Sequence, residues 1–190
     1  MKNPTSKNTS INKDRVPAIY GKLSKHGVYG THLFDVGCGK WTAHIKKYAK
    51  EKGICTHWHG FDPYNQSKQH NEKIIELAFE ELFSDNPNVL VSSNVLNVIK
   101  AGRRDYLQSI FRRMKDIDEL YITVYEGNKS GIGRMTSKDC WQENRRLESY
   151  VEEVMTAYKD THMADFEEGN IKHSIDIKYG MIRVLPNYTK

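Results

Sequence analysis

An apolar strand that runs into a Gly-x-Gly turn and then a helix limits most strongly how this chain can fold. Residues 32–36 are predicted as the strand, Gly37-Cys38-Gly39 follow, and Trp41 to Lys52 reads as a helix stopped by Gly53. Glycine permits a tight turn and lets a ligand approach the backbone, because no Cβ stands in the way. Some turns of this kind bind nothing, so the motif needs support from other parts of the chain.

Strands and helices alternate through most of the remaining sequence. Apolar residues that recur three to four apart predict helices over 18–25 and 67–83, around Tyr106 to Met114, and from a cap at Thr136 or Ser137 to Tyr158. Further strands are predicted at 55–61, 89–92 and 120–124, and 171–185 reads as a hairpin that turns near Tyr179-Gly180. This order predicts an α/β fold: a doubly wound, mostly parallel sheet with a C-terminal antiparallel hairpin.

Composition places the chain among globular proteins. The 190 residues are 38% hydrophobic and carry a net charge of +5, and we expect one domain over 18–190 after a flexible basic tail over 1–17. No apolar run is long enough to span a bilayer, and the N-terminus lacks a secretory signal. Three cysteines without a CxxC pair favour a reducing, cytoplasmic location and no zinc site. No membrane partner is expected.

An acidic residue follows the second predicted strand at the spacing that nucleotide-binding α/β folds use. Asp62 lies in Gly60-Phe61-Asp62-Pro63-Tyr64, 23 positions after Gly39. A carboxylate there can accept hydrogen bonds from both hydroxyls of a ribose, and Pro63 and Tyr64 can lie against an adenine. An Asp before proline also forms turns without any ligand, and that alternative stays open.

The glycine turn departs from two common nucleotide motifs. The dinucleotide pattern G-x-G-x-x-G needs a third glycine where Thr42 stands, and the P-loop pattern is absent. Asp35, two positions before Gly37, suits a cationic group such as a ligand amino group better than a pyrophosphate.

Asp35-x-Gly37-x-Gly39 followed by Asp62 resembles the first two cofactor motifs of class I S-adenosylmethionine-dependent methyltransferases, over roughly residues 30–126. The resemblance implies a Rossmann-like fold, with S-adenosylmethionine as cofactor and a glycine turn around its methionine part. It also implies a ribose contact at Asp62 and a third contact after the next strand. The cofactor-binding residues so implied are Asp35, Gly37, Cys38, Gly39, Asp62, Pro63, Tyr64, Ser93, Asn94 and Val95.

The sequence differs from the family pattern in two respects. Only one long helix separates Asp62 from Val89, so the third strand of the usual seven-stranded family sheet is expected to be missing or very short. Neither the [D/N/S]-P-P-[Y/F] signature of amino-methyltransferases nor the Pro-Cys nucleophile of cytosine-C5 enzymes is present. Residues 93–99 resemble instead those of small-molecule or poorly characterised bacterial and phage methyltransferases.

Substrate groups in this fold come from loops at the carboxyl ends of the strands. The Gly-rich loop after the fourth strand supplies Glu126 and Tyr125 as candidate catalytic groups, and a mobile lid is one interpretation of it. Trp141, Asn144 and Arg145 are predicted to share a helix face that could read a planar substrate. The candidate substrate contacts are Asn97, Lys129, Arg134, Trp141, Gln142 and Asn144.

The sequence therefore predicts a methyltransferase that acts on a nucleic-acid or small-molecule acceptor. Lys/Arg pairs such as Lys46-Lys47 and Arg103-Arg104 favour nucleic acid, whereas the small size favours a compact acceptor. A non-catalytic binding or regulatory protein of the same fold is the main alternative, and a nicotinamide-dependent oxidoreductase is a third hypothesis. His57 and His59 point to one face of a strand, but no third metal ligand is evident. The oligomeric state stays open.

Overall fold

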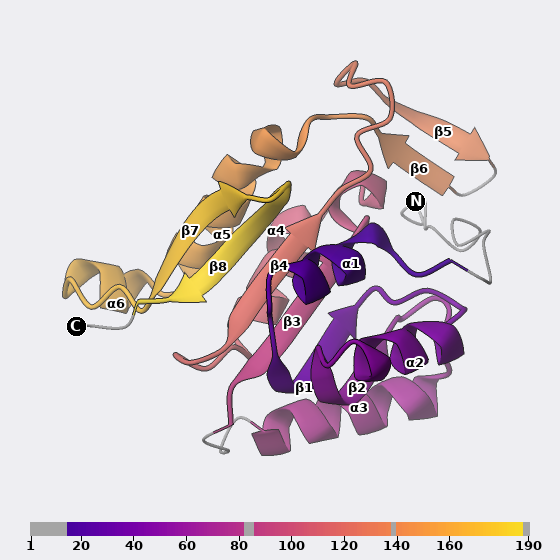
Figure 1. Ribbon diagram of the computed structural model, residues 1–190. Helices are drawn as coiled ribbons and strands as arrows, with labels where there is room; N and C mark the ends of the chain where they lie inside the picture. Colours follow the sequence, from indigo (N-terminus) through magenta and orange to yellow (C-terminus); the bar gives the residue numbers. More distant parts are fainter. Residues whose placement is uncertain (1–14, 82–85, 138–139, 188–190) are drawn as a thin grey trace.

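The computed structural model describes residues 15–81, 86–137 and 140–187. Its centre is a 6-stranded sheet in the order β2-β1-β3-β4-β8-β7 (Figure 1). Four neighbouring strands are parallel: β1 (Gly30–Val36), β2 (Cys55–Phe61), β3 (Asn88–Ser93) and β4 (Glu119–Thr123). The mostly parallel α/β sheet is confirmed. Residues 1–14 of the predicted tail and the predicted helix end at 82–83 lie outside the described residues.

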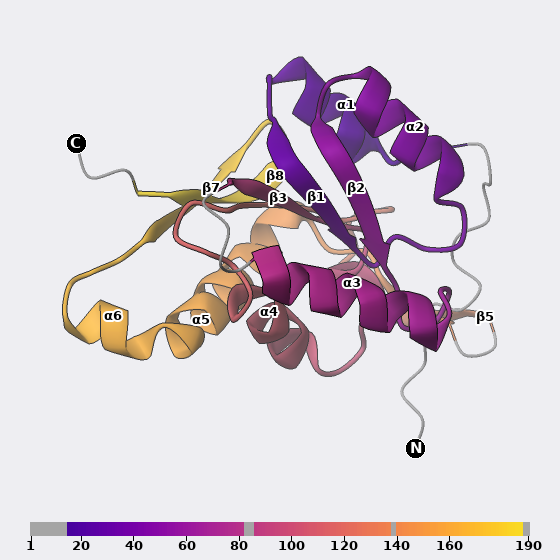
Figure 2. The same ribbon diagram turned by 90° about the horizontal axis from the view of Figure 1, so that it is seen from below.

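Helices cover both faces of the sheet. α1 (Ala18–Lys25) and α2 (Ala43–Glu51) lie on one face, and α3 (Lys68–Glu81), α4 (Arg103–Phe111) and α5 (Val151–Thr161) lie on the other (Figure 2). The short α6 (Met163–Glu167) follows α5. Two hydrophobic cores result, one on each face of the sheet. In the part of the chain described, no helix has the length and apolar character needed to cross a membrane.

The strand order reverses between β1 and β3. The chain passes from β1 through α2 to β2 in one direction, and α3 then carries it back past β1 to β3. Because parallel crossovers are right-handed, this reversal puts α2 and α3 on opposite faces. The chain that leaves the carboxyl end of β1 therefore runs to one face, and the chain that leaves β3 runs to the other (Figure 2). Open α/β sheets bind ligands at such a switch point.

The expected loss of the third family strand is confirmed within the described residues. β2 forms the edge of the sheet, and the single helix α3 leads directly to β3.

The C-terminal hairpin is confirmed as well. β7 (His173–Lys178) pairs antiparallel with β8 (Met181–Pro186), and β8 pairs antiparallel with β4. Tyr179 and Gly180 at the turn both have positive φ, 56° and 67°, as a two-residue hairpin turn requires.

The predicted helix start at Thr136 or Ser137 is wrong. β5 (Gly133–Ser137) and β6 (Cys140–Glu143) form a separate antiparallel hairpin, and the helical path begins only at the 3₁₀ turn η2 (Leu147–Tyr150). Cys140 is buried, and β6 packs on η1 (Leu96–Val98), the 3₁₀ turn after β3. These distant contacts decide the conformation, because the local pattern of the segment fits a helix equally well.

Candidate functional site

The loops after β1, β2 and β3 meet at the carboxyl edge of the sheet, and the first two are hydrogen-bonded to each other. Gly37 N donates to Phe61 O at 2.7 Å, and the Gln66 side-chain amide donates to Gly39 O at 2.7 Å. Gly39 N donates to Asp62 Oδ2 at 2.9 Å. The glycine turn and the acid after the second strand, predicted to serve one ligand, therefore lie in direct contact.

Glycine is required at position 37 by both conformation and space. Gly37 has φ 92°, and a Cβ built on it would lie 2.3 Å from Val95 Cγ2. Val95 belongs to the loop after β3, and its side chain contacts the glycine turn directly. Gly39 also has a positive φ of 74°, which disfavours other residue types.

Asp62 is buried, and its carboxylate organises its own loop. Oδ1 accepts from the backbone N–H groups of Tyr64 and Asn65, both at 2.9 Å. Oδ2 accepts from Gly39 N and from Asn65 Nδ2, the latter at 3.1 Å. These four donors occupy about all the lone-pair positions of a carboxylate. A ribose hydroxyl at Asp62 must therefore displace a donor, and the Asn65 amide is the one that a side-chain rotation removes.

Asp35 is 1% exposed and lies beneath α1. Its Oδ2 accepts a 2.7 Å hydrogen bond from the Tyr20 hydroxyl, which itself accepts one from Trp58 Nε1 at 2.7 Å. Its Oδ1 has no partner. Burial raises the pKa of Asp35 to about 7, against the lowering effect of the Tyr20 hydrogen bond, and the charge of Asp62 adds to the rise. A cationic ligand group beside Oδ1 would be strongly attracted.

The loop after β3 is the third part of the site. Asn94 has φ 60°, and its N–H donates to Thr123 O at 2.8 Å, while Ser93 Oγ lies 3.3 Å from Thr123 Oγ1. Asn97 in η1 is 2% exposed, and its Oδ1 has no partner. A buried acceptor without a donor is rare and points to a ligand or bound water.

Of the other residues assigned to the cofactor, Pro63 and Tyr64 are exposed at the carboxyl edge, whereas Cys38 is buried. Burial raises the pKa of the Cys38 thiol, so it stays protonated and unreactive.

Four residues of the site escaped the sequence analysis. Tyr20 and Trp58 hold Asp35, and Tyr106 donates to Val36 O at 3.1 Å while its hydroxyl lies 2.8 Å from Ser92 Oγ. Asn71 on α3 accepts a 3.1 Å hydrogen bond from Asp62 N at its Oδ1 and donates a 2.9 Å hydrogen bond from its Nδ2 to Asp62 O. All four lie in ordinary strand or helix patterns, so no local signal marks them.

The loop after β4 holds the candidate catalytic residues in different environments. Glu126 accepts from Leu147 N at 2.7 Å and pairs with Lys129 Nζ at 2.9 Å. The Leu147 amide and Lys129 lower the pKa of Glu126. Tyr125 is 56% exposed. Asn144 supports the loop: its carbonyl accepts from Gly131 N at 2.9 Å, and its side chain crowds Gly127.

The predicted helix face with Trp141, Asn144 and Arg145 does not exist, because Trp141 lies on strand β6. Its indole contacts Gly133, where a Cβ would lie 2.0 Å from Trp141 Cζ2, and the Lys100 ammonium lies 5.0 Å from the ring centre. Gln142 on the same strand donates to Asn144 Oδ1 at 2.7 Å, whereas Arg134 on β5 is exposed.

A partly buried ion network fastens the β5–β6 hairpin to the helices. Arg103 of α4 pairs with Glu143 of β6 and lies 3.7 Å from Glu153 of α5. Arg145 pairs with the same Glu153, and its guanidinium stacks 3.9 Å above the Tyr150 ring. The hairpin is thereby held beside the carboxyl edge of the sheet.

Three histidines cluster on β1 and β2. His32 Nδ1 and His59 Nε2 lie 3.0 Å apart, and the His57 ring centre is 4.9 Å from that of His32. Burial and the neighbouring charges of His32 and His57 lower the pKa of His59 to about 4. Among the described residues, no group of three or more His, Cys, Asp or Glu side chains could hold a metal ion.

Comparison with solved structures identifies the fold. No family profile and no curated protein matches the sequence. Among solved structures, it resembles Burkholderia thailandensis 1,6-didemethyltoxoflavin-N1-methyltransferase with bound 1,6-didemethyltoxoflavin and S-adenosylhomocysteine: TM-score 0.55, 14% identity, 94% of this chain and 80% of that chain covered. A structure concerning conversion of a disulfide bond into a thioacetal group during echinomycin biosynthesis gives TM-score 0.52 and 11% identity, covering 94% and 85%. The chain has the Rossmann-like fold of class I S-adenosylmethionine-dependent methyltransferases.

Proposed function

From the class I methyltransferase fold as premise, we propose that this chain is an S-adenosylmethionine-dependent methyltransferase that acts on a compact small-molecule acceptor. The observation that carries the proposal is the buried carboxylate of Asp35. It lies two positions before Gly37, at the switch point of the sheet, with one oxygen unpartnered. Such an arrangement suits a ligand that brings a positive charge to this edge.

The residues present fit S-adenosylmethionine. Asp35 Oδ1, which has no hydrogen-bond partner in this structure, would accept from the amino group of the methionine part, and the Gly37–Gly39 turn would lie against that part. Asp62 would accept from the ribose once the Asn65 amide turns away. The remaining contacts assigned to the cofactor are the adenine contacts Pro63 and Tyr64, the turn residue Cys38, and the loop residues Ser93, Asn94 and Val95.

S-adenosylmethionine supplies, when bound, an electrophilic methyl group on its sulfonium. The protein then has to bind and orient the acceptor and exclude water. The β5–β6 hairpin and the loop over 126–132 stand at the edge where an acceptor would enter (Figure 1). Asn97, whose Oδ1 lacks a donor, is our leading candidate for an acceptor contact. The other candidates are Lys129, Arg134, Trp141, Gln142 and Asn144.

Two observations favour a compact, partly apolar acceptor over nucleic acid. Large exposed hydrophobic side chains follow the carboxyl ends of the parallel strands: Trp41 after β1, Tyr64 after β2, and Tyr125, Ile132 and Met135 after β4. Such side chains contact apolar or planar molecules.

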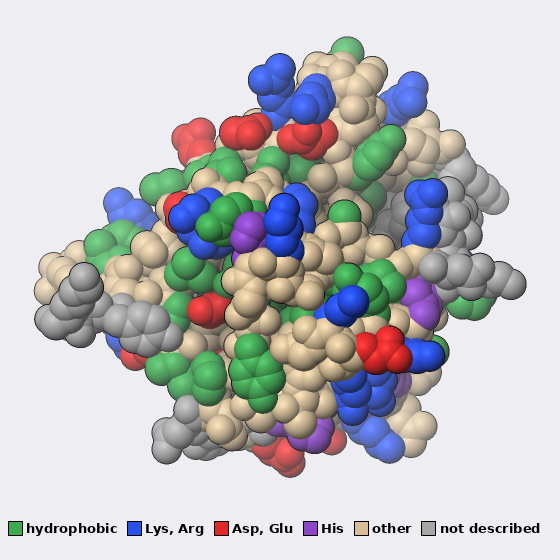
Figure 3. All heavy atoms as spheres, viewed as in Figure 1, with side chains coloured by type: hydrophobic (Ala, Val, Ile, Leu, Met, Phe, Trp, Pro, Cys, Tyr) green, Lys and Arg blue, Asp and Glu red, His purple; other side chains and the backbone are tan. Residues whose placement is uncertain are grey.

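The basic pairs, in contrast, are largely engaged within the protein. Arg103 and Arg145 make partly buried ion pairs with Glu143 and Glu153. Lys and Arg side chains gather over α2, where Lys46, Lys47 and Lys50 are exposed (Figure 3). That helix lies on a face of the sheet rather than at the carboxyl edge.

Calorimetric titration of the protein with S-adenosylhomocysteine and, separately, with NAD tests the cofactor. We expect binding of the first only, and Asp62→Asn should weaken it by about 10-fold or more, since a hydrogen bond to a charged group contributes about 1.5–3 kcal/mol. Asp116→Asn, at an exposed carboxylate of the same type, is the matched control. Equal affinity for NAD, or an unaffected Asp62 variant, would contradict the assignment.

Transfer of a tritiated methyl group into fractionated cell extract tests the acceptor. Label in the small-molecule fraction supports the proposal, and label in nucleic acid refutes the acceptor class. Binding without any transfer would favour the non-catalytic alternative.

Glu126 and Tyr125 remain the catalytic candidates, and their contacts assign them different tasks. Glu126 is already held by an amide and an ammonium, so we infer that it positions the loop, whereas Tyr125 is free to meet the acceptor. Glu126→Gln should therefore keep the pH profile of turnover while raising KM, and Tyr125→Phe should lower kcat. A Glu126→Gln enzyme that lost the acidic limb of its pH profile would reverse the two assignments.

A further inference from the structure

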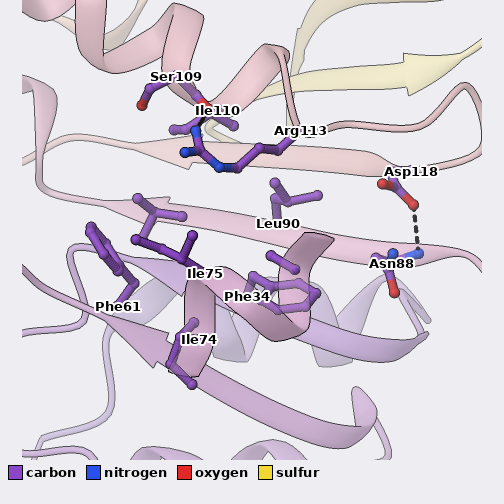
Figure 4. Close-up of a pocket in the computed structure, with 12 residues that line it drawn as sticks. Phe34, Phe61, Ile74, Ile75, Asn88, Leu90, Ser109, Ile110, Arg113 and Asp118 are labelled. Carbon is purple, nitrogen blue, oxygen red and sulfur yellow. Dashed lines mark hydrogen bonds between the residues drawn. The ribbon is translucent and has the colours of Figure 1, made fainter. Parts of the chain in front are cut away.

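A cavity of about 150 Å³ lies between α3, α4 and the sheet, on the face opposite α1 and α2. Its walls are mostly apolar and come from three strands and two helices: Phe34, Val36, Phe61, Leu90, Ile74, Ile75 and Ile110. Ser109 and Arg113 of α4 and the turn after it also line the cavity (Figure 4). α3 packs on β2, whereas α4 packs on α5, and the cavity occupies the wedge between them. A fold that connects β2 to β3 with one helix covers this face incompletely.

One end of the cavity is polar. Asn88 and Asp118 line it together (Figure 4), and Asp118 Oδ1 accepts from Asn88 N at 3.0 Å. The Asn88 side-chain amide also donates to Asp118. Asn88 is only 3% exposed, and its Oδ1 accepts from no group. The cavity thus presents one unsatisfied acceptor at the end of an apolar chamber.

This end is separate from the candidate cofactor site. Asn88 pairs with His32 on β1, and Val36, the last residue before the glycine turn, lies four residues further along the strand. At about 3.3 Å per residue, the polar end is about 13 Å from the carboxyl edge.

The shape and chemistry define the ligand. Apolar cavities of about 150 Å³ take molecules of the size of benzene. A buried acceptor without a donor is costly, and a ligand that supplies one N–H or O–H removes that cost. A water molecule at the polar end would leave the apolar part of the cavity empty.

We propose that the cavity is a second binding site, for a small aromatic molecule that carries a single hydroxyl or N–H donor directed at Asn88 Oδ1. Half-buried Ile74, Ile75 and Ala78 on α3 form the side nearest to solvent and give such a molecule a way in.

Phenol and toluene, which have the same number of heavy atoms, are the probes. With ¹³C-labelled isoleucine δ1 methyls, phenol should shift the signals of Ile74, Ile75 and Ile110. The signals of Ile19, Ile45 and Ile54, in the core on the other face, should stay unchanged. Shifts in both sets, or in neither, would overturn the proposal.

Two variants sharpen the test. Ala78→Phe fills the cavity and should abolish the phenol shifts, whereas Ala43→Phe, at an exposed position on α2, should keep them. Asn88→Ala should lower the preference for phenol relative to toluene by about 10-fold, the equivalent of one hydrogen bond. An unchanged preference, or phenol binding that survives Ala78→Phe, would refute the site.

Saturating S-adenosylhomocysteine should leave phenol binding intact, because the polar end at Asn88 lies about 13 Å from the carboxyl edge. Displacement of phenol would show instead that the cavity belongs to the cofactor site and would overturn the proposal. A failure of phenol to bind leaves the cofactor titration unaffected, so the two hypotheses are tested independently.

Discussion

Asp35→Asn should stabilise the ligand-free protein while weakening the site. The carboxylate is 1% exposed and burial raises its pKa to about 7, against about 3.9 in an unfolded chain. Above pH 7, ionising it in the folded state therefore lowers the free energy of unfolding by about 4 kcal/mol. Asparagine has nearly the same shape and cannot ionise, so this penalty disappears.

The gain is partly offset. The asparagine oxygen can still accept from Tyr20, but its amide nitrogen then takes the place of the unpartnered Oδ1. A buried donor without an acceptor costs about 1–3 kcal/mol. We therefore expect the variant to be about 1–3 kcal/mol more stable than the parent at pH 8.

The sign of the pH dependence follows from the raised pKa. Between about pH 4 and pH 7 the folded state holds the proton more tightly than the unfolded state, so this contribution to stability declines as pH rises through that window. Asp35→Asn has no carboxylate to ionise, so it lacks this decline in the free energy of unfolding. The difference in stability between the variant and the parent should therefore shrink towards pH 4.

Urea unfolding of both proteins from pH 4 to pH 8 measures the difference. Asp116→Asn, at an exposed carboxylate, should stay within about 0.5 kcal/mol of the parent at every pH. A variant that is less stable at pH 8, with a difference independent of pH, would refute the reasoning. In the same variant, S-adenosylhomocysteine should bind about 10-fold or more weakly, because the attraction of a full negative charge is lost.

Three further predictions concern single residues. Gly37→Ala should lower the free energy of unfolding, measured with urea, by about 2–4 kcal/mol, because alanine is strained at a positive φ and its Cβ clashes with Val95. Adding Val95→Ala to this variant should recover only the part of the loss that is due to the clash. Asn65→Ala frees a lone pair of Asp62 and should tighten S-adenosylhomocysteine binding about 2–5-fold by calorimetry, whereas weaker binding would assign the amide to the ligand. The pKa of His59 is lowered in the folded state, so the contribution of this residue to the free energy of unfolding is complete above pH 6.5 and declines as pH falls towards 4. His59→Gln should therefore remove about 2 kcal/mol of the fall in the free energy of unfolding between pH 8 and pH 5. An unchanged dependence on pH would contradict the lowered pKa.

Local patterns in the sequence were sufficient to predict the parallel strands of the sheet, and they indicate the edge at which the candidate site lies. A strand that ends in Gly37 and one that ends before Asp62 are legible because strand periodicity and turn chemistry act over a few residues. The absent third strand could also be predicted, since only one helix fits between Asp62 and Val89.

The tertiary structure decided which polar groups face each other. The sequence shows Asp35 but not that Tyr20, from a helix, and Trp58, from another strand, hold one of its oxygens and leave the other unpartnered. The segment that contains Trp141 was predicted as a helix but forms the β5–β6 hairpin. Its local pattern suits either conformation, and the packing of β6 against η1 and the ion pair between Glu143 and Arg103 decide in favour of the hairpin. Burial and pairing are properties of segments distant in the chain, and they set the charge state, the free acceptors and the cavity that local sequence cannot encode.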